Sequence, residues 1–155
     1  MATSPRVAIL LGSKNDEGHL KATTDLLDRF GIEWELKVLS AHRQPEALHE
    51  YVRHCDAGTT QVFIAAAGLS AALPGVIGSI SSRPVIGLPI PGGALNGIDA
   101  LLSMVQMPGG IPVATVGIGS NGSRNAAILA AQIIALADKA VANKLHAYRE
   151  ELRAS

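Results

Sequence analysis

Short runs of apolar residues, mostly without regular alternation with polar ones, recur along the chain and are rich in Val, Ile and Leu. Runs of this kind are typical of strands buried on both faces of a parallel sheet. Five such strands are predicted, at residues 7–11, 34–39, 61–66, 84–88 and 111–116.

Two segments between these runs carry the apolar spacing of amphipathic helices. The first has one stripe, formed by Leu20, Thr23, Leu26, Leu27 and Phe30, and Gly31 is placed to end that helix. The second begins at Pro45, a residue that the first helical turn tolerates, and its apolar residues follow the i, i+3, i+4, i+7 spacing. These residues are Leu48, Tyr51, Val52 and Cys55.

The alternation of strands and helices predicts an α/β fold with right-handed crossovers and helices on both faces of a central parallel sheet. We expect a flavodoxin-like three-layer sandwich with a C-terminal helical extension at residues 139–153, and a single domain over residues 1–155. Residues 125–136 are apolar nearly all round, which predicts burial against other subunits. The Gly- and Pro-rich residues 89–97 are too poor in polar side chains for an ordinary surface loop.

Composition and charge narrow the classes of function. Of 155 residues, 48% are hydrophobic and 17% charged, which is typical of a packed globular protein. Thirteen basic residues balance thirteen acidic ones, so no net field favours nucleic acid or a membrane surface. The single cysteine, Cys55, excludes an internal disulfide, and the N-terminal residues lack the apolar run of a signal peptide. A soluble cytoplasmic protein is expected.

The residues that follow the first three predicted strands carry the candidate chemistry. Ligands of open parallel sheets bind at the carboxyl ends of the strands. There the chain has Gly12 to Asp16, then Ser40 to Arg43, then a run of small residues from Ala67 to Gly75. Backbone amides at helix starts, one arginine and one histidine would meet at one rim, which suits a phosphorylated small molecule.

Ser13 and Asp16 lie in the first of these loops. The loop lacks the Walker pattern and the later glycines of a dinucleotide fingerprint, so its specificity is low. It is equally well explained as a tight turn in which Asn15 or Asp16 caps the next helix. If the loop binds a ligand, Ser13 offers a hydroxyl to an anion. Asp16 would repel phosphate and suits sugar hydroxyls instead.

His42 and Arg43 form the sharper pair. An arginine binds phosphate oxygens with two parallel donors, and a histidine imidazole titrates near neutral pH, where proton transfer works best. The other histidines lie on predicted helices among polar neighbours and are expected at the surface; they are His19, His49, His54 and His146. No two histidines pair with a carboxylate at a metal-binding spacing, so no metal site is predicted.

Nucleophilic catalysis finds little support. Cys55 falls on the apolar stripe of its helix, which indicates a core residue. Ser13, Ser40 and Ser70 lie outside the Gly-x-Ser-x-Gly elbow of the hydrolase fold. Met104 and Met107 are expected to pack rather than to take part in redox chemistry.

Three motifs together resemble one family, the N5-carboxyaminoimidazole ribonucleotide mutases of de novo purine synthesis. They are Gly-Ser-Lys-Asn-Asp at 12–16, Ser-Ala-His-Arg-Gln-Pro at 40–45, and the long motif from Ser103 to Thr115. The similarity extends from about residue 7 to residue 136 in the same order and spacing.

The resemblance implies a flavodoxin-like subunit in a homo-octamer, with each site built from more than one chain and with no metal or organic cofactor. It implies that a carboxylate moves from the exocyclic nitrogen of the ribonucleotide to ring carbon C4, by release and recapture of carbon dioxide. His42 matches the catalytic histidine and moves the proton. The expected substrate-binding residues are Ser13, Asp16, Ser40, Arg43, Gly68, Leu69, Ser70 and Ala71, the last four bringing backbone amides close to the carboxylate.

The loop at residues 68–75 departs from the family pattern. Mutases usually read Gly-Gly-Ala-Ala-His-Leu-Pro-Gly there, whereas this chain has Ala72 at the histidine position. Ser70 and Ala72 match the related carboxylases, which use free carbon dioxide, while Ala71 and Pro74 match the mutases. Arg43 and the Gln-Met-Pro-Gly run at 106–109 favour the mutase, and Asn15 stands where serine is usual. A carboxylase and a non-catalytic nucleotide-binding module remain the alternatives.

Overall fold

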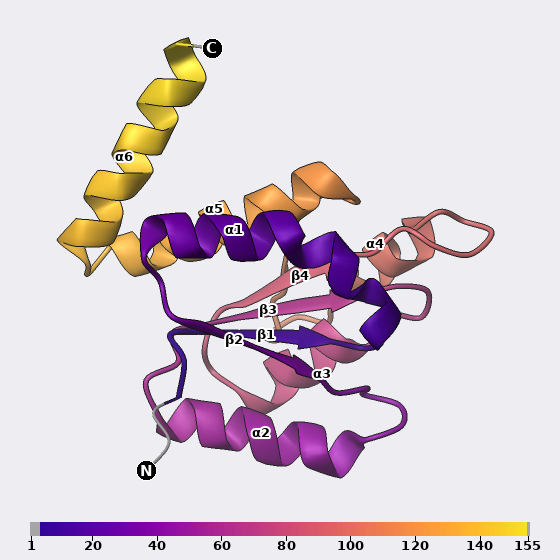
Figure 1. Cartoon of the computed structure of the whole chain (residues 1–155). Helices are drawn as coiled ribbons and strands as arrows, with labels where there is room; N and C mark the ends of the chain where they lie inside the picture. The colour runs from indigo at the N-terminus through magenta and orange to yellow at the C-terminus, as the bar shows by residue number, and fades with distance from the viewer. Residues whose placement is uncertain (1–3, 155) are drawn as a thin grey trace.

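A five-stranded parallel sheet forms the centre of the molecule in the computed structural model, which describes residues 4–154. The strand order is β2-β1-β3-β4-β5, and helices cover both faces of the sheet (Figure 1). The predicted α/β sandwich of flavodoxin-like type is confirmed. The strands are β1 (Val7–Leu11), β2 (Trp34–Val38), β3 (Val62–Ala67), β4 (Val85–Pro89) and β5 (Ala114–Thr115).

The helices include both of those predicted from apolar spacing and several more. The two are α1 (Lys21–Phe30) and α2 (Pro45–Ala57). The terminal helix α6 (Lys139–Ala154) was predicted as the C-terminal extension. The pattern did not predict the 3₁₀ helix η1 (Lys14–Leu20), α3 (Leu73–Ile80) or α4 (Ile98–Val105). No helix in residues 4–154 is both long and apolar enough to cross a membrane.

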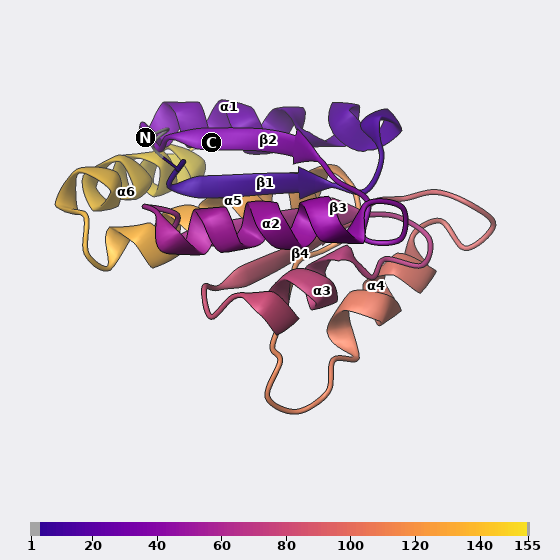
Figure 2. The ribbon, with the colours of Figure 1, turned by 90° about the horizontal axis from the view of Figure 1, so that it is seen from below.

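Alternate side chains of the central strands enter two separate cores. Val7, Ile9 and Leu11 of β1 pack with α1, α5 (Ser120–Ala135) and α6, while Ala8 and Leu10 pack with α2, α3 and α4. Figure 2, seen from below, shows α2 and α3 on the near side of the sheet. Every residue of β1, β3 and β4 is buried, which confirms that these strands are covered on both faces.

The two outer strands correct the prediction of burial on both faces. β2 lies at one edge of the sheet and is only partly buried, with Lys37 and Val38 exposed. β5 lies at the other edge and contains two residues instead of the predicted six, neither of them buried. An edge strand has a neighbouring strand on one side only, so fewer of its side chains are buried.

Local chemistry places the ends of α1 and α2 where they were expected. Gly31 ends α1 with φ 70°, a left-handed conformation that glycine adopts at little cost, and its N–H donates to the carbonyl oxygens of Asp28 and Leu27. Pro45 occupies the first turn of α2, where its missing N–H costs nothing.

The packing of α5 differs from what its composition suggested. The prediction was burial of residues 125–136 against other subunits, but the chain itself covers one side of α5, because Ala126, Ala127, Ala130 and Ala131 are fully buried against the sheet and neighbouring helices. Their small side chains allow α1 to approach closely. Asn125 and Leu136 are exposed, so the helix is not enclosed all round.

The terminal helix α6 projects beyond the sheet (Figure 1). Its first turn is held by Asp138, whose Oδ1 accepts the N–H groups of Ala140 and Val141 and whose Oδ2 accepts a hydrogen bond from Arg6 at 2.8 Å. The Val141 N–H, followed by the Arg6 guanidinium, holds the pKa of Asp138 below its usual value. Further along, Tyr148 meets Phe30 edge to face.

Candidate functional site

The strand order opens a crevice at the carboxyl end of the sheet. β1 and β3 are neighbours, with Leu11 level with Ala66, but the chain leaves β1 toward α1 on one face and leaves β3 toward α3 on the other. Adjacent loops that part in this way leave a space between them, which is where ligands of open α/β sheets bind. The candidate residues predicted from the sequence follow strands that end at this edge.

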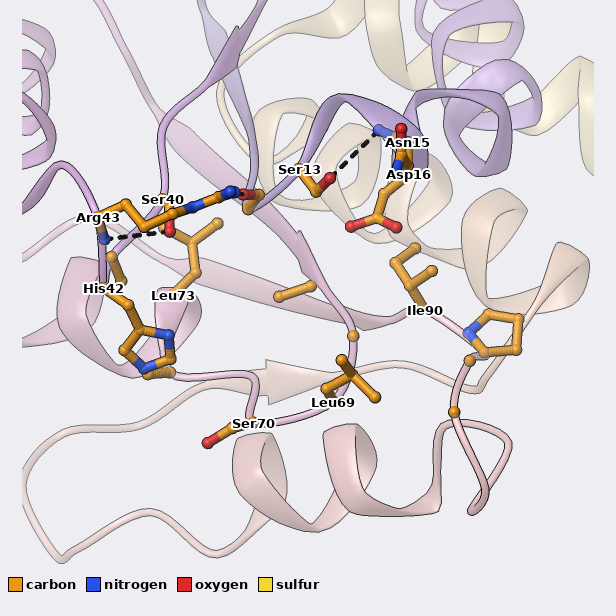
Figure 3. A pocket seen from close by; sticks show the side chains of 18 residues that line it. Ser13, Asn15, Asp16, Ser40, His42, Arg43, Leu69, Ser70, Leu73 and Ile90 are labelled. Carbon is orange, nitrogen blue, oxygen red and sulfur yellow. Dashed lines mark hydrogen bonds between the residues drawn. The ribbon is translucent and has the colours of Figure 1, made fainter.

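A cavity of about 570 Å³ occupies this crevice. Figure 3 shows Ser13 and Asp16 on one side of it and Ser40, His42 and Arg43 on the other. Eight of the nine predicted site residues line it, namely Ser13, Asp16, Ser40, His42, Arg43, Gly68, Leu69 and Ser70. The ninth, Ala71, is not a lining residue, and its side chain is buried in the core with α2 and α3.

The loop after β1 is ordered by its own serine. Ser13 is the N-cap residue of η1, and its hydroxyl accepts the N–H of Asn15 at 3.3 Å. The expectation that Asn15 or Asp16 caps this helix was therefore wrong. Because capping is done by Ser13, the carboxylate of Asp16 is left to face the cavity (Figure 3).

The loop after β2 is a tight turn that presents His42 and Arg43 to the cavity. The Ser40 hydroxyl, which is buried, accepts the N–H of Arg43 at 3.3 Å, and the Ser40 carbonyl accepts the N–H of Gln44 at 2.9 Å. Nη2 of Arg43 donates to the carbonyl oxygen of Gly12 at 3.0 Å. This bond ties the second loop to the first and leaves other guanidinium donors available.

The loop after β3 has an unusual backbone. Leu69 has φ 53°, in the left-handed region that a leucine seldom adopts, and its side chain is 56% exposed. The neighbouring Gly68 passes close to the next loop, since a Cβ there would lie 3.3 Å from the carbonyl oxygen of Ile90. A larger residue at 68 would push the two loops apart.

A fourth loop, after β4, completes the cavity with Ile90, Pro91, Gly92 and Gly93. This stretch is unusually apolar for a loop but was not among the predicted site residues. The signal was present, because β4 ends level with β3, Pro89 pairing with Ala67, and any loop that follows must reach the same rim. Ala41, Ala67, Ala72 and Leu73 also line the cavity; they lie in the loops that were predicted to carry the chemistry but were not among the nine predicted site residues.

Electrostatics separates the two sides of the cavity. Burial raises the pKa of Asp16 above its ordinary value, and the nearby His19 only partly opposes this effect. Arg43 supplies a permanent positive charge across from it. An elongated ligand with an anionic group at one end and hydroxyl groups at the other would match this arrangement.

The remaining candidates of the sequence analysis lie away from the cavity. His19, His54 and His146 are exposed, as expected, whereas His49 is half-buried on α2. Cys55 is a buried free thiol in the core, where burial raises its pKa, and Met104 is fully buried too. Within residues 4–154, no cluster of three or more His, Cys, Asp or Glu side chains is arranged to hold a metal ion.

Comparison with protein families gives one match that spans nearly the whole chain. The family model described as AIR carboxylase matches residues 6–155. Eight curated relatives that are 44–49% identical to this chain are named N5-carboxyaminoimidazole ribonucleotide mutase. That of Methanocaldococcus jannaschii is 49% identical over 95% of this chain and 90% of its own length. Those of Saccharolobus solfataricus and Bacillus subtilis are 47% and 46% identical over 96% of this chain and 93% and 92% of theirs.

Solved structures agree with the sequence comparison. The crystal structure of Treponema denticola PurE superposes with a TM-score of 0.87 at 34% identity, over 95% of this chain and 90% of that one. A variant of PurE2 from the same organism gives 0.88 at 33% identity, over 97% and 92%. Fold and sequence therefore point to the same group of proteins.

Proposed function

Since this chain belongs to the AIR carboxylase family, we propose that it is an isomerase of purine biosynthesis, an N5-carboxyaminoimidazole ribonucleotide mutase. It converts N5-carboxyaminoimidazole ribonucleotide to 4-carboxy-5-aminoimidazole ribonucleotide. The cavity at the carboxyl end of the sheet carries this proposal, because one space brings together a histidine, an arginine, a serine and an aspartate from two separate loops.

The substrate is held by its phosphate and by its ribose. Arg43 and the hydroxyl of Ser13 bind the phosphate, the guanidinium through charge-assisted hydrogen bonds. Asp16, which lies on the same side of the cavity as Ser13, accepts hydrogen bonds from the ribose hydroxyls. Ser40 lines the same space and fixes the turn that carries Arg43.

His42 moves the proton that the isomerisation requires. Cleavage of the bond between the exocyclic nitrogen and its carboxylate releases carbon dioxide, and the nitrogen takes up a proton from the imidazolium. Ring carbon C4 then attacks carbon dioxide, and the C4 hydrogen returns to the imidazole as the ring regains aromaticity. Proton and carboxylate balance over the cycle, so no cofactor is consumed.

The loop after β3 lies beside the reacting carbon dioxide. Gly68, Leu69 and Ser70 line the cavity, and Gly68 has no side chain to keep a ligand away from its backbone. Amide dipoles fixed before the reaction stabilise the developing carboxylate without reorganising during it. Ala71 does not line the cavity; its side chain is buried in the core, so it supports the loop from behind.

A rate comparison tests the proposal. The purified protein is supplied either with the N-carboxylated nucleotide or with the uncarboxylated nucleotide plus bicarbonate, and formation of the C4-carboxylated product is followed. The mutase assignment predicts fast conversion of the first substrate. Fast conversion of the second alone would contradict it.

One observation favours the carboxylase as the second candidate. Ser70 and Ala72, the positions at which the loop follows the carboxylase pattern, both line the cavity. Free carbon dioxide would then enter the site from solution, with His42 removing the C4 proton in the same way. The same rate comparison separates the two enzymes.

We further propose that residues 1–155 act as one catalytic domain within a cytoplasmic homo-octamer, whose sites are completed by neighbouring chains. A subunit contact is supported by the outer face of α4, where Ile98, Leu102 and Val105 are each more than half exposed. Large apolar side chains gathered on one helix face are typical of interfaces. The free thiol of Cys55 suits a reducing compartment.

A further inference from the structure

Leu69 is the one bulky apolar lining residue of the cavity that is largely exposed. The other large apolar side chains of the lining, Leu73 and Ile90, are buried, at 2% and 3% exposure against 56% for Leu69. Figure 3 shows Leu69 at the cavity between Ser70 and Ile90. A single exposed leucine needs no explanation by itself, so its backbone and its contacts decide the matter.

The backbone of Leu69 is held in an unfavourable conformation. Within residues 4–154, only Leu69 and Asn96 combine a side chain with a positive φ. Asparagine tolerates the left-handed region because its short polar side chain bonds locally, whereas leucine gains nothing of the kind. A strained residue of this sort persists where the surrounding structure determines its position, as at ligand-binding sites.

The side chain of Leu69 reaches across to the loop after β4. A Cβ built on Gly93 would lie 2.6 Å from Cδ2 of Leu69, so the isobutyl group occupies the space that a side chain at 93 would need. Gly93 itself has φ 63° and is exposed. The leucine therefore bridges the loops after β3 and β4 at the entrance of the cavity.

We propose that Leu69 covers the reacting ring of the substrate and retains carbon dioxide between its release and its recapture. The inference rests on the proposed function. Once the bond between nitrogen and carboxylate breaks, the gas either reacts with C4 or escapes, leaving the uncarboxylated nucleotide. An apolar cover at the entrance slows that escape and keeps water away from carbon dioxide and the nucleophilic carbon C4.

The test follows an isotope label from substrate to product. N5-carboxyaminoimidazole ribonucleotide carrying labelled carbon in its carboxylate is converted in buffer with unlabelled bicarbonate, and both label retention and release of uncarboxylated nucleotide are measured. Leu69→Gly removes the side chain while accepting the left-handed backbone, so folding is preserved. Leu69→Met keeps the apolar bulk, and Leu152→Ala, at a leucine with 55% exposure on α6, is the matched control.

Wild type and Leu152→Ala are expected to retain the label, and Leu69→Met to retain most of it. Leu69→Gly is expected to release about fivefold more uncarboxylated nucleotide per product formed. Equal retention in Leu69→Gly and wild type would overturn the role of Leu69, as would equal loss in the Met and Gly variants. A change in subunit assembly without a change in retention would also overturn it. Failure of the wild type to convert the substrate would instead remove the proposed function itself.

Discussion

Nη2 of Arg43 donates a hydrogen bond to the carbonyl oxygen of Gly12 at 3.0 Å, although the two residues are 31 positions apart in sequence and lie in the loops after two different strands. This bond sets the spacing between Arg43, which is proposed to bind the phosphate, and Ser13, which follows Gly12. The two binding loops are therefore positioned relative to each other before any substrate arrives, which lowers the cost of ordering them on binding.

Replacing Arg43 tests this positioning. Arg43→Ala is expected to raise KM between about tenfold and a hundredfold, the range for one charged hydrogen-bonding group, with a small effect on thermal stability because the side chain is exposed. The KM of Arg43→Lys should lie between those of wild type and Arg43→Ala, since an ammonium group keeps the charge but cannot donate two parallel hydrogen bonds. Arg149→Ala, at an exposed arginine on α6, is the control in steady-state kinetics. A KM unchanged in Arg43→Ala would contradict the phosphate contact.

His42→Asn separates proton transfer from binding. The variant should keep subunit assembly and substrate affinity, because asparagine retains polarity and approximate size. Turnover should fall by a factor of about a hundred or more, the contribution expected of a general acid and base. Binding is measured by calorimetry and turnover by product formation, with His146→Asn, an exposed histidine on α6, as the control. Near-normal turnover in His42→Asn would show that another group carries the proton.

Asp16→Asn should weaken substrate binding without lowering the stability of the fold at pH 7. Because burial raises the pKa of Asp16, the folded protein binds this proton more tightly than the unfolded chain. The contribution of Asp16 to stability is thus most favourable below its unfolded pKa and is lost as pH rises through the raised value.

The neutral variant should therefore melt at or slightly above the wild-type temperature at pH 7, and this advantage should shrink as pH falls. Its KM should rise, because an amide replaces the charged acceptor for the ribose hydroxyls. Melting curves from pH 7 down to about pH 4 measure the first effect. Glu17→Gln, at an exposed carboxylate of the same 3₁₀ helix, is the comparison. A stability gain that grows on acidification would have the wrong sign.

Thr23→Val tests the contact between α1 and α5. The buried hydroxyl of Thr23 donates to the carbonyl oxygen of Ser123 at 2.7 Å and lies 2.8 Å from its hydroxyl. Valine has nearly the same shape but removes the hydrogen-bond partner of the buried Ser123 hydroxyl, so the free energy of unfolding should fall by about 1–3 kcal/mol. Urea unfolding measures it. Thr24→Val should lower the free energy of unfolding much less, because the Thr24 hydroxyl donates only to the carbonyl oxygens of Leu20 and Lys21, in the preceding turn.

The sequence predicted the parts of the fold that a repeated pattern encodes. Strands β1, β3 and β4 were recognised because burial on both faces leaves continuous apolar runs. Helix α3 was missed because its eight residues include a proline and two glycines, which carry no helical signal, and packing on the sheet overrides that weak propensity. Helix α4 was missed although Ile98, Leu101, Leu102 and Val105 have helical spacing, because eight residues are too few for that period to be distinguished from a short apolar run.

Most of the polar residues of the site could be predicted from the sequence, whereas most of its apolar residues could not. Ser13, His42 and Arg43 follow strands directly, so topology alone gathers them at one rim. The loop with Ile90 and Gly93 escaped because apolar and glycine residues carry no chemical signature. The side chain of Ala71 turned into the core because a loop residue can face either way, and its direction depends on packing that the sequence does not display.

The charged residues of β2 have a consequence for the behaviour of the protein at high concentration. Glu35 and Lys37 pair at 3.0 Å on the outermost strand, beside the hydrogen bond from Tyr51 to Glu35. A foreign strand that docked along this edge would have to accommodate both ionic groups, which is a common natural guard against fibril formation. With the opposite margin reduced to two residues, the sheet offers little template for uncontrolled polymerisation from either side.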